Sequence, residues 1–199
     1  QKEALIQIKN GFKQKNVCLL HGVTSSGKTE IYIKLIEGYI KEKKQILFLV
    51  PEIALTTQLV GRVKKYFGDL LSVYHSKYSV DHRTEIWKKV LNNDKKSRVI
   101  LGARSSIFLP FSNLGLIIID EEHENAYKQY NTAPRYHARD SAIYLSSIHN
   151  VKTLLGSATP SVESYYNAIS SKYALIEIKK RFGNFKFPEI IIQDLRTKK

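Results

Sequence analysis

The sequence has 199 residues, with 32 lysines and arginines against 18 aspartates and glutamates, so its formal net charge is +14. A chain of this length can form one domain that buries roughly 70% of its unfolded surface without a disulfide or metal staple. Hydrophobic residues make up 43% and charged residues 25%, which excludes a mainly disordered protein. The positive excess favours a polyanionic partner, nucleic acid before an anionic membrane surface; a lysine-rich composition that serves only solubility is the alternative.

Cysteine and apolar content narrow the class of protein further. The single cysteine, Cys18, excludes an internal disulfide and a zinc site of clustered cysteines within this chain, and it is expected to be a buried structural thiol. No apolar run approaches the ~18 residues needed to span a bilayer, and no secretory signal is visible. We therefore expect a cytoplasmic location and no membrane partner. The chain lacks methionine and begins at Gln1, so we expect it to be a piece of a longer protein.

Short apolar runs alternate with longer amphipathic stretches along the chain. The runs rich in β-branched residues predict strands at 17–20, 45–50, 71–74, 98–101, 114–119 and 152–155. The stretches between them predict helices at 28–41, 54–67, 80–92, 139–147 and 161–170. Continuous apolar strands are typical of a parallel sheet, so the predicted fold is α/β, a doubly wound, mainly parallel sheet with helices on both faces.

The alternation of predicted strands and helices ends after residue 172. Two extended segments are expected at 173–178 and 189–192, joined by the basic segment 179–186. We assign residues 1–172 to one nucleotide-binding domain and 173–199 to a C-terminal extension, or to the start of a connection to a missing domain. The lone tryptophan, Trp87, lies in a predicted helix near Ile86 and Val90 and is expected in the core.

A glycine-rich motif follows the first predicted strand and opens the first predicted helix. It consists of Gly22, Val23, Thr24, Ser25, Ser26, Gly27, Lys28 and Thr29. It matches the phosphate-loop pattern G-x-x-x-x-G-K-[ST] and predicts a P-loop NTPase. Its backbone N–H groups and the helix N-terminus suit a β-phosphate. Lys28 is expected to reach the β- and γ-phosphates of ATP, and the Thr29 hydroxyl to coordinate Mg²⁺.

Acidic residues follow the predicted strand at 114–119. Ligands of α/β folds lie at the carboxyl ends of strands, so Asp120 is expected to hold the Mg²⁺. Glu121 is the candidate for orienting and deprotonating the attacking water. Together with Lys28 they form the predicted catalytic set; an acidic helix start is the alternative. His123 has no partner histidine or cysteine at zinc spacing, so a hydrogen-bonding linker is expected there rather than a metal ligand.

Several motifs now resemble superfamily-2 helicases in their DEAH/DExH form. Asp-Glu-Glu-His at 120–123 is similar to their second motif and Ser-Ala-Thr at 157–159 to the third. Pro-Glu-Ile-Ala-Leu-Thr-Thr-Gln at 51–58 resembles motif Ia, and Gly-Ala-Arg-Ser-Ser-Ile-Phe at 102–108 resembles motif Ib. Together with Tyr-Lys-Gln at 127–129 and Arg-Tyr-His-Ala-Arg-Asp at 135–140, the set resembles the PriA family of primosomal replication-restart helicases over about residues 1–164.

The resemblance implies further roles. Gln1, in the order Gln-x-x-Ala ahead of the phosphate loop, falls where such helicases often place an adenine-reading glutamine. Coupling between ATP and DNA is implied for His123, Ser157 and Thr159. Contacts to the single-strand backbone are implied for Thr56, Thr57, Gln58, Arg104 and Ser105, residue types that suit sequence-independent phosphate binding. An ordinary helix N-terminus is the alternative for 56–58.

Aromatic and cationic residues alternate after the acids. The predicted nucleic-acid contacts there are Tyr127, Lys128, Tyr130, Arg135 and Tyr136. Such a segment can stack single-stranded bases, and in the resembling family it is a loop that links DNA binding to hydrolysis. Tyrosines that merely pack beneath a surface loop are the alternative. One departure from the family is Ser25, which replaces a glycine of the phosphate loop and would be strained if that position needs φ > 0.

The resemblance implies the first lobe of an ATP-dependent 3′→5′ DNA helicase that acts on single-stranded and forked DNA. It also implies a second helicase lobe in cis, a zinc segment in the missing part of the parent protein, and primosome and single-strand-binding proteins as partners. We expect this chain alone to bind ATP with Mg²⁺ but to hydrolyse it slowly. The alternatives are a superfamily-2 translocase on other branched DNA or on RNA, and a noncatalytic, ATP-switched binding module.

Overall fold

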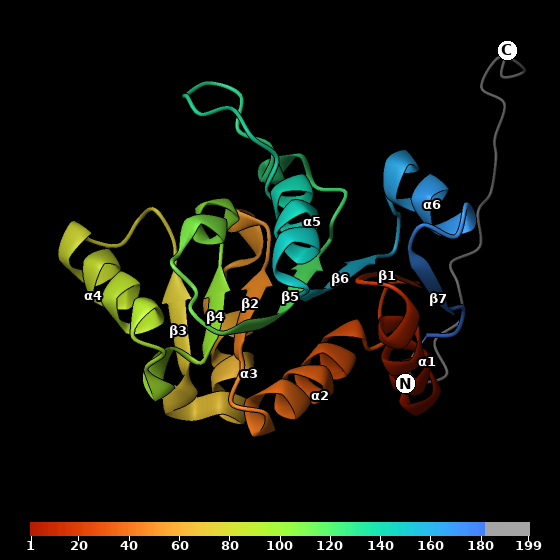
Figure 1. Cartoon of the computed structure of the whole chain (residues 1–199), viewed down its shortest axis with the longest axis horizontal. Coiled ribbons are helices and arrows are strands. Elements are labelled where there is room, and N and C mark those ends of the chain that lie inside the picture. Colours follow the sequence, from red (N-terminus) through yellow and green to blue (C-terminus); the bar gives the residue numbers. More distant parts are fainter. Residues whose placement is uncertain (182–199) are drawn as a thin grey trace, which may run out of the picture.

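The computed structural model describes residues 1–181, which form a seven-stranded sheet covered by helices (Figure 1). The strands are β1 Val17–Gly22, β2 Gln45–Leu49, β3 Leu71–Tyr74, β4 Val99–Gly102, β5 Leu114–Asp120, β6 Lys152–Ser157 and β7 Ala174–Ile178. They lie in the order β3-β4-β2-β5-β6-β1-β7, and every pairing within it is parallel. The predicted doubly wound α/β fold is confirmed.

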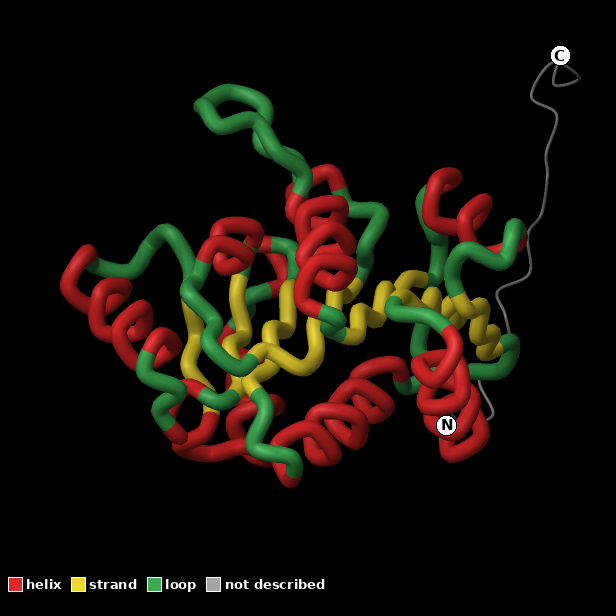
Figure 2. Tube along the Cα trace, viewed as in Figure 1, coloured by secondary structure: helices red, strands yellow, loops and turns green. Residues whose placement is uncertain are grey.

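Helices cover both faces of this sheet. They are α1 Lys2–Gln14, α2 Lys28–Lys41, α3 Thr57–Phe67, α4 Val80–Leu91, α5 Ala138–His149 and α6 Val162–Ile169. The first three pack on one face and the last three on the other, as the two groups of coiled ribbons in Figure 1 and the red tubes in Figure 2 show. The described part of the chain contains no helix long and apolar enough to cross a membrane.

Alternating side chains of each strand supply the two cores. In β2, Ile46 and Phe48 point into the α1–α3 side, while Leu47 and Leu49 point into the α4–α6 side. Successive side chains of a strand face opposite sides, so a continuous apolar run is what a sheet covered on both faces requires. Because all strands run parallel, their carboxyl ends meet at one edge, and the motifs that follow β1, β2, β4, β5 and β6 meet there.

The predicted elements differ from the observed ones in a few places. The helix α1 was not expected, although Ala4, Ile8 and Phe12 recur at every fourth position and are buried against the sheet. The predicted helix at 54–67 begins only at Thr57, because a 3₁₀ turn at Glu52–Ala54 precedes it.

The C-terminal part of the chain is described only in its first residues. The expected segment at 173–178 contains β7, the edge strand beside β1. The segment at 189–192 and most of 179–186 lie outside the described residues. The domain boundary at residue 172 stays a prediction.

Two single-residue predictions can be checked against burial. Cys18 is fully buried in β1, as expected, and burial raises the pKa of its thiol to about 12. The expectation that Trp87 lies in the core is wrong, since it is 43% exposed. Ile86 and Val90 turn towards the sheet from α4, and Trp87 lies about 100° around the helix from Ile86, which directs it away from the core.

Candidate functional site

The phosphate loop joins β1 to α2 and closes around its own lysine. Lys28 is the first residue of α2, and its Nζ donates a hydrogen bond of 3.0 Å to the carbonyl of Gly22. A Cβ at Gly22 would lie 2.8 Å from Ser26 Oγ and 3.3 Å from Lys28 Cγ, so a side chain there would collide with the loop. Glycine at this position therefore lets the lysine fold back over the turn.

Two loop residues have left-handed backbone conformations. Gly27, the N-cap of α2, has φ 84°, and Ser25 has φ 62°. Glycine adopts this region without steric cost, whereas serine does not. The strain expected from serine at position 25 is therefore present in the loop.

The loop opens into a cavity of about 820 Å³. The lining residues are Gln1, Thr24, Ser25, Ser26, Gly27, Lys28, Thr29, Glu30, Arg62, Asp120 and Glu121. Gln1 donates from Nε2 to the carbonyl of Ser26 at 3.3 Å, which places its amide over the loop. The cavity thus brings the predicted nucleotide-binding residues together with both predicted acids at the end of β5 and in the turn after it. Only Gly22 and Val23 of the predicted set do not line it.

Asp120 ends β5 and is held by two donors. Tyr32 donates its hydroxyl to Oδ1 at 2.9 Å, and the N–H of Glu121 donates to the same atom at 3.1 Å. Burial raises the pKa of Asp120 to about 6; the hydrogen bond from Tyr32 and the charge of Lys28 oppose this shift, and the Glu121 carboxylate adds to it. A carboxylate desolvated to this extent is stabilised by a neighbouring cation, which is the chemistry of a metal ligand.

Tyr32 was not foreseen as part of the site. It is fully buried on α2, one turn after Lys28, and burial together with the charge of Asp120 raises the pKa of its hydroxyl well above the ordinary value. The hydroxyl occupies the space beside Gly156, where a Cβ would lie 1.8 Å from it. The spacing of four residues from Lys28 was a usable signal, because residues i and i+4 share a helix face.

Glu121 lies between the lysine and the histidine of the motif. Its Oε1 is 3.8 Å from Lys28 Nζ, and its Oε2 is 3.7 Å from His123 Nδ1. Its backbone is left-handed, with φ 47°, a conformation that non-glycine residues adopt at a cost. The turn after β5 therefore directs this carboxylate into the phosphate-loop cavity.

His123 makes the contact expected of a linker. Its Nδ1 lies 2.7 Å from Ser157 Oγ, and its Nε2 lies 3.4 Å from Thr159 Oγ1. Ser157 Oγ also accepts the N–H of Thr159 at 2.9 Å. The acid-bearing turn after β5 and the Ser-Ala-Thr segment after β6 are thus joined by side chains, and the proposed coupling role of these residues has a physical connection.

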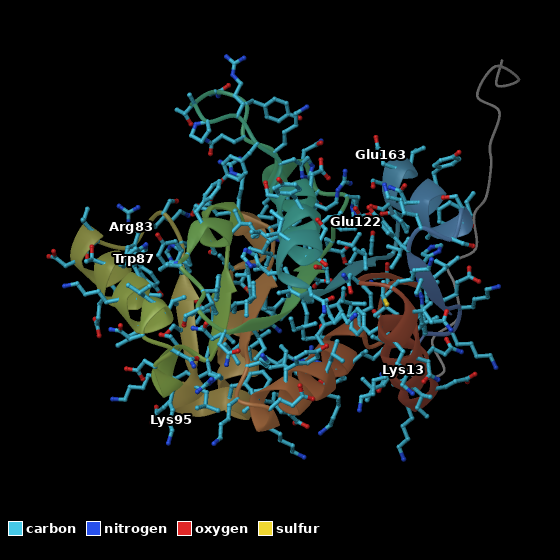
Figure 3. The ribbon with its side chains drawn as sticks, in the orientation of Figure 1. Lys13, Arg83, Trp87, Lys95, Glu122 and Glu163 are labelled. Atoms are coloured by element: carbon cyan, nitrogen blue, oxygen red, sulfur yellow. The ribbon has the colours of Figure 1, made fainter. Side chains whose placement is uncertain are left out.

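Glu122 forms a buried network that sequence reasoning missed. It is fully buried between α5 and α6 (Figure 3) and is paired at 3.0 Å with Arg139, the second residue of α5. Its carboxylate also accepts the Ser161 N–H at 2.7 Å, the Ser161 hydroxyl at 3.2 Å and the Ser164 hydroxyl at 2.8 Å. One carboxylate therefore fixes the start of both helices to the end of β5.

Comparison with known families agrees with this arrangement. The sequence profile of the DEAD/DEAH box helicases matches residues 1–168. The chain belongs to this family.

Relatives with curated names in several bacteria share much of the sequence. The chain is 47% identical over 183 residues to the replication restart protein PriA of Bacillus subtilis (strain 168), covering 92% of this chain and 22% of that protein. It is 46% identical over 182 residues to PriA of Haemophilus influenzae, covering 92% and 24%. The chain thus spans about a quarter of the length of these relatives.

Solved structures share the helicase-lobe fold. RecG bound to a three-way DNA junction aligns with a TM-score of 0.66 and 23% identity, covering 93% of this chain and 24% of that one. The helicase MrfA bound to DNA and AMPPNP aligns with a TM-score of 0.59 and 18% identity, covering 88% and 27%. At this identity the likeness shows the fold.

Helicase motifs Ia and Ib lie beside each other at the carboxyl edge of the sheet. Thr56 caps α3, its side chain accepting the Leu59 N–H at 3.3 Å, and Thr57 and Gln58 in the first turn are exposed. Arg104 donates to the carbonyls of Lys128 at 2.7 Å and Ala126 at 3.3 Å. Arg104 and Ser105 line a cavity of about 280 Å³ with Glu52 from the Ia side. The DNA contacts of these residues stay predictions.

The segment that follows the acids is a hairpin that projects from the body (Figures 1 and 2). Lys128 and His137 form an antiparallel bridge at its base. Tyr130 is 54% exposed with Lys128 Nζ 4.8 Å from its ring centre, Arg135 is exposed, and Tyr136 packs edge-on against Phe108. These side chains leave aromatic and cationic surface accessible.

Tyr127 does not belong to this exposed set. It is fully buried, and its hydroxyl donates to the carbonyl of Asp120 at 2.6 Å. The predicted stacking of a base on Tyr127 is therefore wrong, because its ring is covered by protein. The 3₁₀ turn Asn125–Tyr127 directs the ring inward beneath the hairpin, where it supports the end of β5.

Proposed function

We propose that the chain is the nucleotide-binding lobe of an ATP-dependent 3′→5′ DNA helicase that acts at stalled or branched replication forks. The observation that carries this proposal is one cavity in which the phosphate loop faces Asp120 at the end of β5 and Glu121 in the turn after it. The kinship with proteins named replication restart protein PriA supports the fork as the place of action. Because the chain spans about a quarter of those relatives, the activity of the whole protein is part of the proposal.

The residues of the cavity fit ATP and Mg²⁺. Ser26 Oγ is buried without a hydrogen-bond partner among the described residues, and the N-terminus of α2 opens onto the cavity. Lys28 would hold the β- and γ-phosphates, and Gln1, whose amide lies over the loop, would contact the adenine. The Thr29 hydroxyl and the desolvated Asp120 carboxylate are the oxygen donors that would hold Mg²⁺.

Hydrolysis at this site requires a base near the terminal phosphate. Glu121 would orient the attacking water and accept its proton, and its left-handed backbone directs the carboxylate towards Lys28. Bound Mg²⁺ would supply positive charge that neutralises charge on the phosphates. His123, Ser157 and Thr159 would pass a change at Glu121 to the start of α6.

The nucleic acid would lie along the carboxyl edge of the sheet. Thr56, Thr57, Gln58, Arg104 and Ser105 would contact the backbone of a single strand, and the hairpin would stack bases. In the longer protein, a second lobe in cis would supply the arginine that completes the ATP site. The partners of that protein would be forked DNA, single-strand-binding proteins and the primosome.

Calorimetric titration of Mg·ATP into the 199-residue chain tests the nucleotide site. The chain should bind, Lys28→Ala should lose binding, and Lys34→Ala should not, because Lys34 is an exposed residue of the same helix that pairs with Glu37. Equal binding by both variants contradicts the assignment. Repeating the titration with a short single-stranded DNA asks whether coupling already resides in this lobe.

ATP turnover of the complete protein tests the substrate. Stimulation by forked DNA beyond that by RNA is the expected result. Stronger stimulation by RNA would favour an RNA-directed enzyme of the same superfamily. A turnover unchanged by Glu121→Gln would favour an ATP-switched binding module.

A further inference from the structure

Trp87 is an exposed aromatic residue on a helix that otherwise packs on the sheet. It is 43% exposed, while Ile86 and Val90 on the same helix are buried. Exposure of this much apolar tryptophan surface to water is unfavourable. The ring is therefore available for another surface to cover.

The exposed face of Trp87 lines a hollow between α4 and the end of β3. This hollow, here called the Trp87 groove, has a volume of about 380 Å³ and is lined by Tyr74, Val80, Arg83, Thr84 and Trp87. Arg83 and Trp87 are four residues apart on α4, and Figure 3 shows them close together on the same side of that helix. The groove thus combines two aromatic rings with one guanidinium.

Arg83, which lines this groove, carries a donor that has no partner in the described part of the chain. Its Nε is buried, and no described residue accepts a hydrogen bond from it. A buried donor without an acceptor destabilises a protein, so a ligand that supplies an acceptor is favoured here. The planar guanidinium matches phosphate oxygens in particular.

The charges near the groove suit an anion. Lys77 and Lys88 are exposed, and Glu85 is occupied by an ion pair with Lys89. Among the described residues no acid lines the groove, and Asp81 lies in the first turn of α4, where the helix dipole offsets its charge. The chain as a whole carries +14, which adds attraction for a polyanion.

The position of the groove connects it to the helicase motifs. The loop that leaves β3 carries Ser76, which donates to Glu52 of motif Ia at 3.2 Å. Ser76 also lines the cavity shared by Glu52, Arg104 and Ser105. A strand held at motifs Ia and Ib at this edge of the sheet would reach the Trp87 groove beyond this loop, on the side of the edge strand β3.

We propose that the Trp87 groove binds single-stranded DNA, with a base stacked on Trp87 and the adjoining phosphate on Arg83. This inference rests on the proposed function and adds a contact outside the helicase motifs. An aromatic ring beside a cation is the combination that binds single strands without regard to sequence. The groove would extend the DNA track from motifs Ia and Ib to the outer strand of the sheet.

Trp87 is the single tryptophan of the chain, so its fluorescence reports on this groove alone. We would titrate the 199-residue chain with end-labelled oligo(dT) of about 20 nucleotides, longer than typical single-strand sites. Tryptophan emission and label anisotropy are recorded together. Quenching of Trp87 that saturates at the same concentration as the anisotropy is the expected result.

Variants separate the groove from the rest of the surface. Trp87→Ala should weaken binding roughly fivefold or more, and Trp87→Phe should restore most of it, because a phenyl ring still stacks. Arg83→Ala should lower the salt dependence of log Kd by about one unit of slope. Tyr144→Ala, an exposed aromatic residue on α5, and Lys13→Ala on α1 are the matched controls and should bind as the original chain does.

Two outcomes would overturn the proposal in different ways. In the first, DNA binds by anisotropy while the emission of Trp87 does not change and the Trp87→Ala variant binds as tightly as the original chain. That result would mean that DNA binds elsewhere on the lobe and that the groove binds a protein segment instead. The proposed function would then stand without the groove. Absence of DNA binding by both readouts would count against the proposed DNA contacts of the lobe as well.

Discussion

The acids after β5 and the hairpin that follows them are neighbours in sequence but are held in opposite ways. Glu122 is fully buried and accepts four hydrogen bonds from Arg139, Ser161 and Ser164. Tyr130 and Arg135 are exposed, and Tyr130 has the neighbouring Lys128 over its ring. Within about 15 residues the chain passes from fixed side chains to accessible ones.

The difference in burial follows from the ligand that each region would bind. Phosphate transfer needs groups held in one geometry, so the acids are fixed by buried hydrogen bonds. A single strand of any sequence needs aromatic faces and cations that can adjust, so exposed residues suit it. The two regions should therefore respond differently to substitution, and the predictions below test this contrast.

The largest effect is expected for Glu121→Gln in the complete protein. DNA-stimulated ATP hydrolysis should fall at least about 100-fold, because the amide cannot accept the proton of the attacking water. Nucleotide binding should be retained, which calorimetry checks. Glu124→Gln is the control, since Glu124 lies 4.0 Å from the far nitrogen of His123 and outside the lining of the cavity. An equal loss of ATP hydrolysis in both variants would contradict the assignment of Glu121 as the catalytic base.

Glu122→Ala should destabilise the fold without touching the nucleotide cavity. Loss of one partner of a buried ion pair costs about 3–5 kcal/mol. The lower end is expected here, because Ser161 and Ser164 lose their acceptor while Arg139 keeps its bonds to Asp140 and Ser161. Glu163→Ala, on the exposed first turn of α6, should cost less than about 1 kcal/mol. Urea denaturation of the two variants measures the difference, and similar midpoints would contradict the network.

The two tyrosines on either side of the hairpin base should separate stability from DNA binding. Tyr127→Phe removes the hydrogen bond to the Asp120 carbonyl and should lower the free energy of unfolding by about 1 kcal/mol. Tyr130→Phe should leave stability unchanged. Tyr130→Ala should weaken oligo(dT) binding roughly fivefold or more through lost stacking. If the Tyr130→Ala variant binds DNA with unchanged affinity, the hairpin does not stack bases and its tyrosines have only a structural role.

The smallest effect is expected at Ser25, within the fixed region. Ser25→Gly relieves a left-handed backbone at φ 62° and should raise stability by about 0.5 kcal/mol, after the greater entropy of glycine in the unfolded chain is subtracted. Thr24→Gly is the control and should lower stability, since Thr24 does not have a positive φ. Thermal unfolding of the two variants gives the sign of each change in stability. A change of the same sign in both variants would show that backbone strain at Ser25 does not cause the effect of Ser25→Gly.

The sequence predicts the sheet well because its strands are continuous apolar runs bounded by turn residues. The phosphate loop and the acids could be located because each has a spacing tied to its chemistry. Tyr32 and Glu122 could not, since their roles depend on which helices pack over the ends of β5 and β6. Tyr127 and Trp87 were misassigned for the same reason, because a pattern of residue types does not reveal which way a short turn or a helix face is directed.

Gly156 and Tyr32 carry a consequence for how this lobe can vary among species. The phenol fills the space that a side chain at position 156 would need, and it bonds to Asp120 from there. The two positions are therefore expected to change together: a larger residue at 156 is compatible only with a shorter one at 32. Lineages that lose the tyrosine would then have to orient Asp120 by another donor, and the pair should appear as a linked substitution in their sequences.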